Sequence, residues 1–177
     1  MKSARSLEFL ACEHFAAAVD EVAHDLVGRT LRVTRGTDII DALIVETEAY
    51  GGAEDAASHA AFRPGGRARM MLERAGTIYV YTAYGMYPCL NIVTGQIGQP
   101  SAVLLRGALL DYDQRLVSGP GRLGRTLQVT VADNGLDCAG PEYQVSQERR
   151  EFRILHTPRI GITRATDTLW RFVAELE

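Results

Sequence analysis

Apolar and β-branched residues recur in short runs along most of the chain, and this pattern predicts a fold built mainly from strands. The segments 29–35 and 39–50 flank the turn Gly36-Thr37-Asp38, as two antiparallel strands would. Further strands are expected at residues 77–84, 87–93, 102–110, 153–162 and 169–173.

The segments between these runs are expected to be helical or irregular. Residues 6–18 have helical spacing, and Asp20 and Gly28 bound a second helix as its cap and its end. Residues 51–76 and 133–151 are polar and rich in turn-forming residues. A long irregular segment such as the first is usually functional or disordered, and we expect the second to be mobile.

Composition limits the class of protein. With 177 residues, of which 46% are hydrophobic, the chain can bury one core without disulfides or metals. We therefore expect a single α+β domain over residues 1–177, with a curved, mainly antiparallel, open-barrel-like sheet and peripheral helices. Because no apolar run approaches the roughly 18 residues of a membrane span and no signal-peptide pattern is present, a soluble intracellular protein is expected.

Charge and cysteine usage exclude several kinds of site. A net charge of -3 and a pI of about 5.8 do not suit a protein held to nucleic acid by charge alone, so any such binding must be local. The three cysteines, Cys12, Cys89 and Cys138, form neither a zinc motif nor a disulfide framework. Lys2 is the only lysine, which excludes Schiff-base chemistry from a lysine inside the fold.

The stretch Val45-Glu46-Thr47-Glu48-Ala49-Tyr50 is the strongest candidate for chemistry. It ends a strand that reads as part of the core, and it places Glu46, Glu48 and Tyr50 at period 2, on one face. Gly51-Gly52 follows directly. From these residues alone, the acids either face a functional loop or decorate a wet surface.

Arginine and tyrosine supply the other candidates. Arg106 interrupts the apolar strand 102–110 and needs an anionic partner, which Glu46 or Glu48 could supply, either for function or as a structural ion pair. The arginines of 51–76 either track a phosphate backbone or belong to a solvated loop. Tyr84 lies in a turn that can present an aromatic ring at an exposed tip.

In their order along the chain, these motifs resemble the alkyladenine (3-methyladenine, methylpurine-type) DNA glycosylase family. The resemblance covers nearly the whole chain, and the ordered combination is specific. The motifs are Val45-Glu46-Thr47-Glu48-Ala49-Tyr50, Glu54-Asp55 with His59, Tyr79-Val80-Tyr81 with Tyr84-Gly85-Met86, Asn91, Leu104-Leu105-Arg106 and Gly119-Pro120-Gly121.

The resemblance implies a monofunctional enzyme that hydrolyses the N-glycosidic bond of an alkylated purine flipped out of duplex DNA. Deaminated and etheno purines are further candidate substrates. By motif position, Glu48 matches the general base that activates a water against C1′ of the deoxyribose. Arg106 matches the residue that holds this water and the acid together. No metal and no cofactor are implied.

The resemblance also assigns residues to the base and to the DNA. Tyr50, His59 and Tyr81 match the aromatic walls of the base pocket, which suit a cationic alkylated ring. Asn91 matches the pocket-floor residue that disfavours the exocyclic amine of guanine. Tyr84 matches the wedge that fills the gap left by the flipped nucleotide.

The chain departs from the family pattern after His59. It has an arginine-rich run, Arg63 to Arg69, where the family usually shows a Thr-Pro-Arg-Asn type run, so individual phosphate contacts stay unassigned. We expect Arg67 and Arg69 to contact DNA. The expected partner is damaged double-stranded DNA, bound by a monomer without membrane association, in the cytoplasm near the nucleoid if the source is bacterial.

Two functions of other classes remain as alternatives. A glycoside hydrolase could use Glu46 and Glu48 as its acid pair, but alternate strand residues lie roughly 6.6 Å apart and point in parallel rather than flanking a sugar. A non-catalytic nucleic-acid-binding β module would explain the tyrosines by base stacking, but not an acid in the same pocket. Release of a free base from alkylated DNA discriminates among the three.

Overall fold

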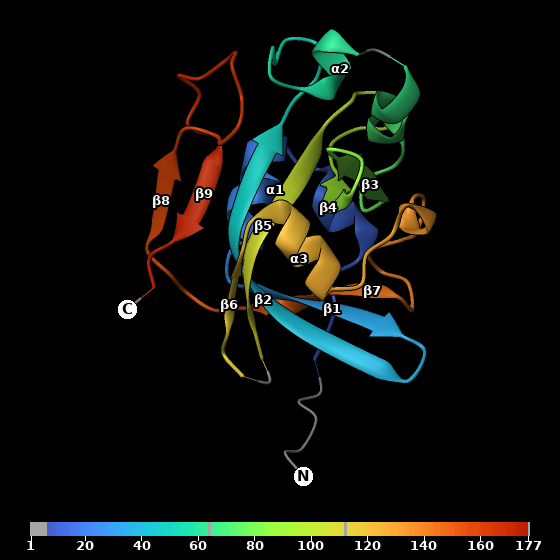
Figure 1. Cartoon of the computed structure of the whole chain (residues 1–177), viewed down its shortest axis with the longest axis vertical. Coiled ribbons are helices and arrows are strands. Elements are labelled where there is room, and N and C mark those ends of the chain that lie inside the picture. The colour runs from blue at the N-terminus through green and yellow to red at the C-terminus, as the bar shows by residue number, and fades with distance from the viewer. Residues whose placement is uncertain (1–6, 64, 112, 177) are drawn as a thin grey trace.

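The long strand β2, Asp38–Tyr50, is the centre of the fold (Figure 1). In the computed structural model, which describes residues 7–63, 65–111 and 113–176, β2 pairs with three other strands. One edge pairs with β5, Ala102–Leu110, and the other edge pairs first with β1, Arg29–Arg35, and then with β9, Arg171–Ala174. The register with β5 shifts on both sides of Glu46, at the level where the pairing with β9 begins.

The other strands extend this sheet on both sides. They are β3 (Ile78–Ala83), β4 (Tyr87–Val93), β6 (Leu116–Ser118), β7 (Tyr143–Arg149) and β8 (Ile154–Thr157). The main order is β3-β4-β5-β2-β1-β7, with β6 paired to β5 and β8 paired to β9. All pairings among the described strands are antiparallel, and the sheet does not close into a barrel. The expected α+β class is confirmed.

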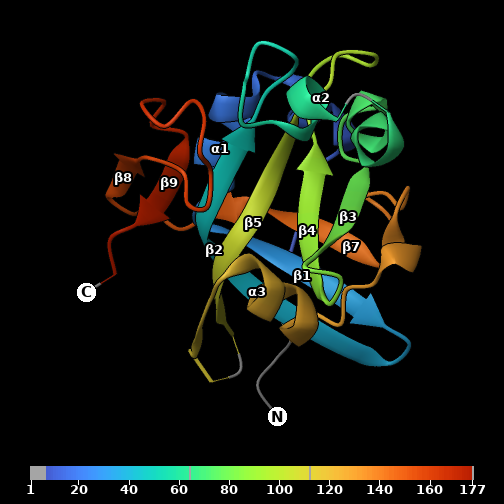
Figure 2. The same cartoon turned by 45° about the horizontal axis from the view of Figure 1, so that its top comes forward.

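Short helices cover the sheet at its ends. They are η1 (Cys12–Ala16), α1 (Val19–Leu26), α2 (His59–Phe62), η2 (Gly66–Leu72), α3 (Pro120–Thr126) and η3 (Val131–Asp133). Figure 2 shows α2 above the upper ends of β4 and β5, while α3 crosses near the opposite end of the same two strands. None of the helices in the described part of the chain is long and apolar enough to cross a membrane.

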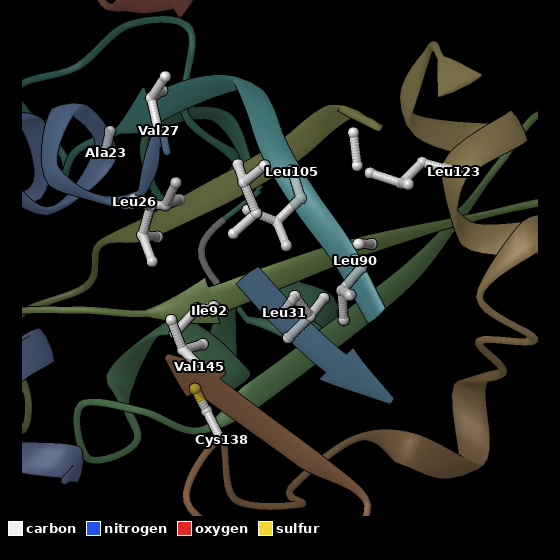
Figure 3. Packing of buried hydrophobic residues seen from close by; sticks show 14 of the residues in the cluster. Ala23, Leu26, Val27, Leu31, Leu90, Ile92, Leu105, Leu123, Cys138 and Val145 are labelled. Atoms are coloured by element: carbon white, nitrogen blue, oxygen red, sulfur yellow. The ribbon is translucent and has the colours of Figure 1, made fainter. Parts of the chain in front are cut away.

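One face of the sheet packs into the main core. Leu26 and Val27, at and just after the end of α1, pack with Leu105 of β5 and with Leu31 of β1 in one buried cluster (Figure 3). The Thr47 hydroxyl donates to the backbone carbonyl of Ala23 at 2.7 Å, which ties β2 to α1. Because successive residues of a strand point to opposite faces, the alternate residues of β2 and β5 lie on the other side of the sheet.

The strand predictions hold for the first five strands and need correction near the end of the chain. The predicted strand 153–162 is wrong in length, because β8 covers only Ile154–Thr157. Pro158 follows and has no N–H for a ladder, and Arg159 turns inward to bind Asp55. The last strand begins at Arg171 rather than at Leu169.

The prediction of a mobile segment at 133–151 is wrong. Residues 143–149 form β7, which pairs with β1. Tyr143 and Val145 are fully buried and alternate with polar residues, so the strand has one apolar face although the segment as a whole is polar.

The helix predictions hold only in part. Instead of one helix over 6–18, the described part forms the short 3₁₀ helix η1, and Phe9 makes a bridge to Ser146; residue 6 lies outside the described residues. The second helix is capped by Ala18 rather than by Asp20. The irregular segment 51–76 contains α2 and η2.

Candidate active site

Four neighbouring strands contribute one row of side chains to the face opposite the main core. Glu48 of β2 pairs with Leu104 of β5, Leu104 with Asn91 of β4, and Asn91 with Tyr79 of β3. Because alternate residues of a strand share a face, Tyr50, Arg106, Cys89 and Tyr81 lie on the same side. The sheet register thus brings together residues that are up to about 60 positions apart in sequence.

Glu48 is the buried acid of this face. Its side chain is fully buried. Oε1 accepts the backbone N–H of Ile160 at 2.7 Å, and Oε2 accepts the Tyr50 hydroxyl at 2.8 Å and the Arg106 Nη1 donor at 3.4 Å. A buried carboxylate requires such donors, and three of them from three segments fix the position of both oxygens.

Arg106 lies between two carboxylates, which confirms the expected acidic partner. Its Nε donates to Glu46 at 3.0 Å, and Glu46 also accepts Arg171 Nε at 2.7 Å. Gly107 lies opposite Glu46 in the register, and a Cβ there would be 3.1 Å from the Glu46 Cβ. A glycine at 107 therefore leaves room for this buried network of alternating charges.

Four aromatic side chains, Tyr50, His59, Tyr79 and Tyr81, lie on or over the face that holds Glu48. The His59 and Tyr81 rings meet edge to face at 5.0 Å between centroids, and His59 Nδ1 lies 3.2 Å from the Tyr79 hydroxyl. Tyr50 and Tyr81 pack in one cluster with Met71 of η2. Ser58 caps α2 by accepting the Ala60 N–H, which sets the position of His59 at the start of that helix.

Burial keeps these rings uncharged. It raises the pKa of the Tyr50 and Tyr81 phenols, with a further increase from Glu48, and raises the pKa of Tyr79 to about 12. The pKa of His59 is lowered from 6.5 by burial and by the positive charges of Arg67 and Arg63. At neutral pH the cluster therefore presents neutral rings beside the Glu48 side chain.

Asn91 is buried at the centre of the row. Its Nδ2 donates to the carbonyls of Tyr79 at 3.1 Å and Cys89 at 3.2 Å. Both hydrogens of the amide are engaged by the backbone, which fixes the orientation of the side chain.

Tyr84 lies at the tip of the β3–β4 hairpin, as predicted. Its side chain is 92% exposed and its φ is 50°, a conformation that only a tight turn normally requires. Met86 beside it is also exposed. The tip projects a large ring away from the core.

The predicted DNA-binding arginines lie on η2. Arg67 donates to the Thr82 carbonyl at 3.4 Å and, with Arg63, lines a cavity of about 350 Å³. His59 and two glycines complete that lining, whereas Arg69 is exposed and lies outside it. No group of three or more His, Cys, Asp or Glu side chains within the described ranges is arranged to hold a metal ion.

The sequence of this chain is similar to sequences of known proteins. A sequence model of the methylpurine-DNA glycosylase family matches residues 13–177. The chain belongs to the methylpurine-DNA glycosylase family. A protein of Anaeromyxobacter sp. (strain Fw109-5) named "Putative 3-methyladenine DNA glycosylase" is 43% identical over 173 residues, which cover 94% of this chain and 89% of that protein. Proteins of the same name from Clostridium novyi and Rickettsia felis are 36% and 39% identical, over 90% and 94% of this chain and 92% and 93% of their own lengths.

Membership in the methylpurine-DNA glycosylase family confirms the resemblance seen in the motifs, and with it the enzyme class, a hydrolase of N-glycosyl bonds. The structure gathers Glu48, Arg106, Tyr50, Tyr81 and His59 on or over one face of the sheet. Their individual roles in this glycosylase stay predictions.

Several residues around the site of this family member were given no role from the sequence, although Asp55 belongs to one of the motifs that carry the resemblance. Asp55 and Arg159 form a buried ion pair, Ile160 donates its N–H to Glu48, and Arg171 binds Glu46. Arg159 stands between Pro158 and Ile160, in an apolar stretch, as Arg106 does. Because a buried arginine needs an anionic partner, the sequence signal that singled out Arg106 was also present at Arg159. The hydrogen bond from the Ile160 backbone N–H to Glu48 could not be predicted from the pattern of side chains, because it does not depend on the Ile160 side chain.

Proposed function

We propose that this protein is a monofunctional DNA glycosylase that hydrolyses the N-glycosidic bond of alkylated purines flipped out of double-stranded DNA. One observation carries the proposal: a fully buried carboxylate, Glu48, is held by three donors beside neutral aromatic rings on one face of the sheet. Enzymes that act on a base inside a duplex need such a pocket, because the target atom is inaccessible in the stack.

Glu48 is the proposed general base. A carboxylate fixed in this way accepts a proton from water and, after bond cleavage begins, offsets the positive charge that develops on the sugar. Arg106 holds Glu48 by its Nη1 and holds Glu46 by its Nε, so the guanidinium keeps the acid in place from one side. A ring-alkylated purine is itself cationic and leaves readily, so one carboxylate and one water suffice.

The proposed base pocket is formed by Tyr50, Tyr81 and His59, with Asn91 on its floor. A cationic base over neutral aromatic faces gains about 1 kcal/mol or more when desolvated. The neutral state of His59 avoids repulsion between an imidazolium and such a base. The rings therefore suit alkylated purines, and deaminated and etheno purines are further candidate substrates.

The proposed partner is damaged duplex DNA, bound by one copy of the chain. Tyr84 enters the minor groove at the lesion, and Arg67 and Arg69 contact phosphates, as does Arg63 beside the cavity of η2. Cleavage by water rather than by an amine is proposed because Lys2, which lies outside the described residues, is the only lysine. Only its side chain and an N-terminal amine could act as the nucleophile instead.

A panel of duplexes tests this function. Each duplex carries one lesion, and the assay detects the free base released under single-turnover conditions. We expect release of alkylated purines in preference to undamaged guanine and adenine. Tight binding of lesion DNA without base release would instead indicate the non-catalytic β module.

Tyr84→Ala is expected to weaken extrusion of the base. Without the exposed ring, the unstacking cost of a few kcal/mol is uncompensated, so excision from duplex DNA should fall about tenfold or more. A fluorescent base analogue opposite the site reports flipping directly. Met86→Ala, at the same exposed tip, is the matched control, and equal signals in both variants and the parent would remove the wedge role from Tyr84.

The lowered pKa of His59 predicts a pH-dependent stability. The unfolded chain binds a proton at this imidazole near pH 6.5, whereas the folded protein does not until lower pH. The free energy of unfolding should therefore decrease as pH falls below about 6.5, and the His59→Gln variant should show a shallower decrease. Thermal unfolding of both proteins between about pH 7.5 and 5 measures the difference. Parallel curves would mean that His59 titrates alike in the folded and unfolded states.

A further inference from the structure

The chain after β8 carries a buried arginine that belongs to no strand. Arg159 has a fully buried side chain and binds Asp55 with two hydrogen bonds, Nη1 to Oδ2 at 2.6 Å and Nη2 to Oδ1 at 2.8 Å. Asp55 lies in the loop after β2, 104 residues earlier in sequence. A two-point contact of this kind fixes the direction of the guanidinium as well as its distance.

The Arg159 guanidinium also contacts the end of β2. Its Nη1 donates to the Ala49 carbonyl at 2.8 Å, and its carbon lies 4.9 Å from the centre of the Tyr50 ring. Trp170, just before β9, packs on the same group at 5.4 Å. One cation thus joins the end of β2 to the two ends of the segment between β8 and β9, which lies beside β2 in Figure 2.

Asp55 is itself held in place. It accepts the N–H groups of Gly51 at 2.9 Å and Ala57 at 3.1 Å. Burial alone would raise its pKa, but Arg159 and these two amides hold the pKa below its ordinary value. The Asp55 carboxyl group therefore stays ionised to lower pH than an ordinary aspartate does, which favours its contact with Arg159.

The residue that follows Arg159 touches the proposed general base. The N–H of Ile160 donates to Glu48 Oε1 at 2.7 Å, although the Ile160 side chain is about half exposed. No packing of that side chain into the core holds the amide, whereas the neighbouring Arg159 is locked. Along the chain, the fixed contact nearest to this amide is the ion pair one residue away.

We propose that Asp55 and Arg159 are positioning residues for catalysis: they place the Ile160 amide so that it orients the Glu48 carboxylate toward the attacking water. This rests on the proposed function, because it assumes that Glu48 is the general base. A structural ion pair would stabilise the fold without any specific effect on the chemical step, and the two cases differ in what a variant changes.

Asp55→Asn and Arg159→Lys test the pair with little change in volume. Misplacement of a catalytic group by about 1 Å costs up to about 100-fold in rate, so we expect single-turnover excision to fall about 10- to 100-fold. Affinity of Asp55→Asn for lesion DNA should stay within about threefold of the parent, since Asp55 contacts Arg159 and two backbone amides rather than the rings of the proposed base pocket. Arg159 lies against the Tyr50 ring, so the rate at saturating enzyme is the readout for Arg159→Lys. Thermal unfolding before each assay establishes that the variants are folded.

The pH–rate profile supplies a readout that a structural role would not move. An amide hydrogen bond favours the charged form of a carboxylate, so its loss should shift the acid limb of the excision profile of Asp55→Asn to higher pH. The other groups that face Glu48 stay in place in this variant: Tyr50, Arg106 with its partner Glu46, and Tyr81.

Asp41→Asn is the matched control. Asp41 binds Arg32 through two bonds of 2.7 Å, the same kind of ion pair, but between β1 and the opposite end of β2. We expect the excision rate of Asp41→Asn, and the acid limb of its pH–rate profile, to match those of the parent protein.

Ile160→Pro and Ile160→Ala complete the test. Proline removes the N–H and alanine keeps it, so only the proline variant should lose rate. Combined with Ile160→Pro, Asp55→Asn should add little further loss, because both act through one hydrogen bond. Additive losses, or a rate that falls only with the folded fraction while the acid limb stays fixed, would overturn the proposal. Base release by the parent protein in the same assay tests the proposed function separately.

Discussion

Glu48→Gln should nearly abolish base excision while leaving lesion binding intact. The amide preserves the shape of the strand end but cannot take a proton from water, and loss of a general base typically costs about 10² to 10⁴ in rate. It also removes negative charge from beside the cationic sugar, so we expect the upper end of this range. Single-turnover excision and the dissociation constant for lesion DNA measure the two effects, with affinity within about tenfold of the parent.

Glu46→Gln is the control for this prediction. Glu46 binds Arg106 and Arg171, so its loss loosens the support of the site but leaves the carboxylate beside the tyrosines. Its rate should fall much less than that of Glu48→Gln. An inactive Glu46 variant with an active Glu48 variant would reverse the roles of the two acids.

Among the proposed variants, Arg106→Met should cause the largest decrease in the free energy of unfolding. The guanidinium is buried between Glu46 and Glu48, and its removal leaves Glu48 without a cation and Glu46 with Arg171 alone. Breaking a buried ion pair by removing one partner costs about 3–5 kcal/mol. The unfolding free energy from chemical denaturation measures this loss.

Arg153→Met is its matched control. Arg153 also binds a carboxylate, that of Glu175 at 3.3 Å, but both side chains are exposed. Such surface pairs contribute little, so the unfolding free energy should scarcely change. Equal losses in the two arginine variants would show that burial of the Arg106 network has no energetic consequence.

The sequence predicted those parts of the fold whose signal is local. Strands β1 to β5 combine alternation with apolar composition, and the turn at Gly36 separates the first two. The signal failed at β7, where Tyr143 and Val145 give a buried face to a polar segment, because average polarity hides alternation in a short strand. It failed again after β8, where the strand ends at Thr157 and Arg159 binds Asp55, a partner 104 residues away in sequence.

The candidate site divides in the same way. Glu48 and Arg106 are conspicuous because a charged residue inside an apolar strand demands a partner, and the structure supplies that partner from the neighbouring strand. One donor to Glu48 comes from the segment after β8, and it is a backbone N–H, which every non-proline residue possesses. Only the three-dimensional path of the chain identifies it.

The most direct test of the central claim is the chemistry of the products from a duplex carrying a single 7-methylguanine. We expect the protein to release the free methylated base and to leave an intact abasic strand, with no protein–DNA adduct after borohydride treatment, because water and not an amine attacks the sugar. A trapped covalent adduct, or bound DNA from which no base is released, would contradict hydrolysis at the Glu48 site.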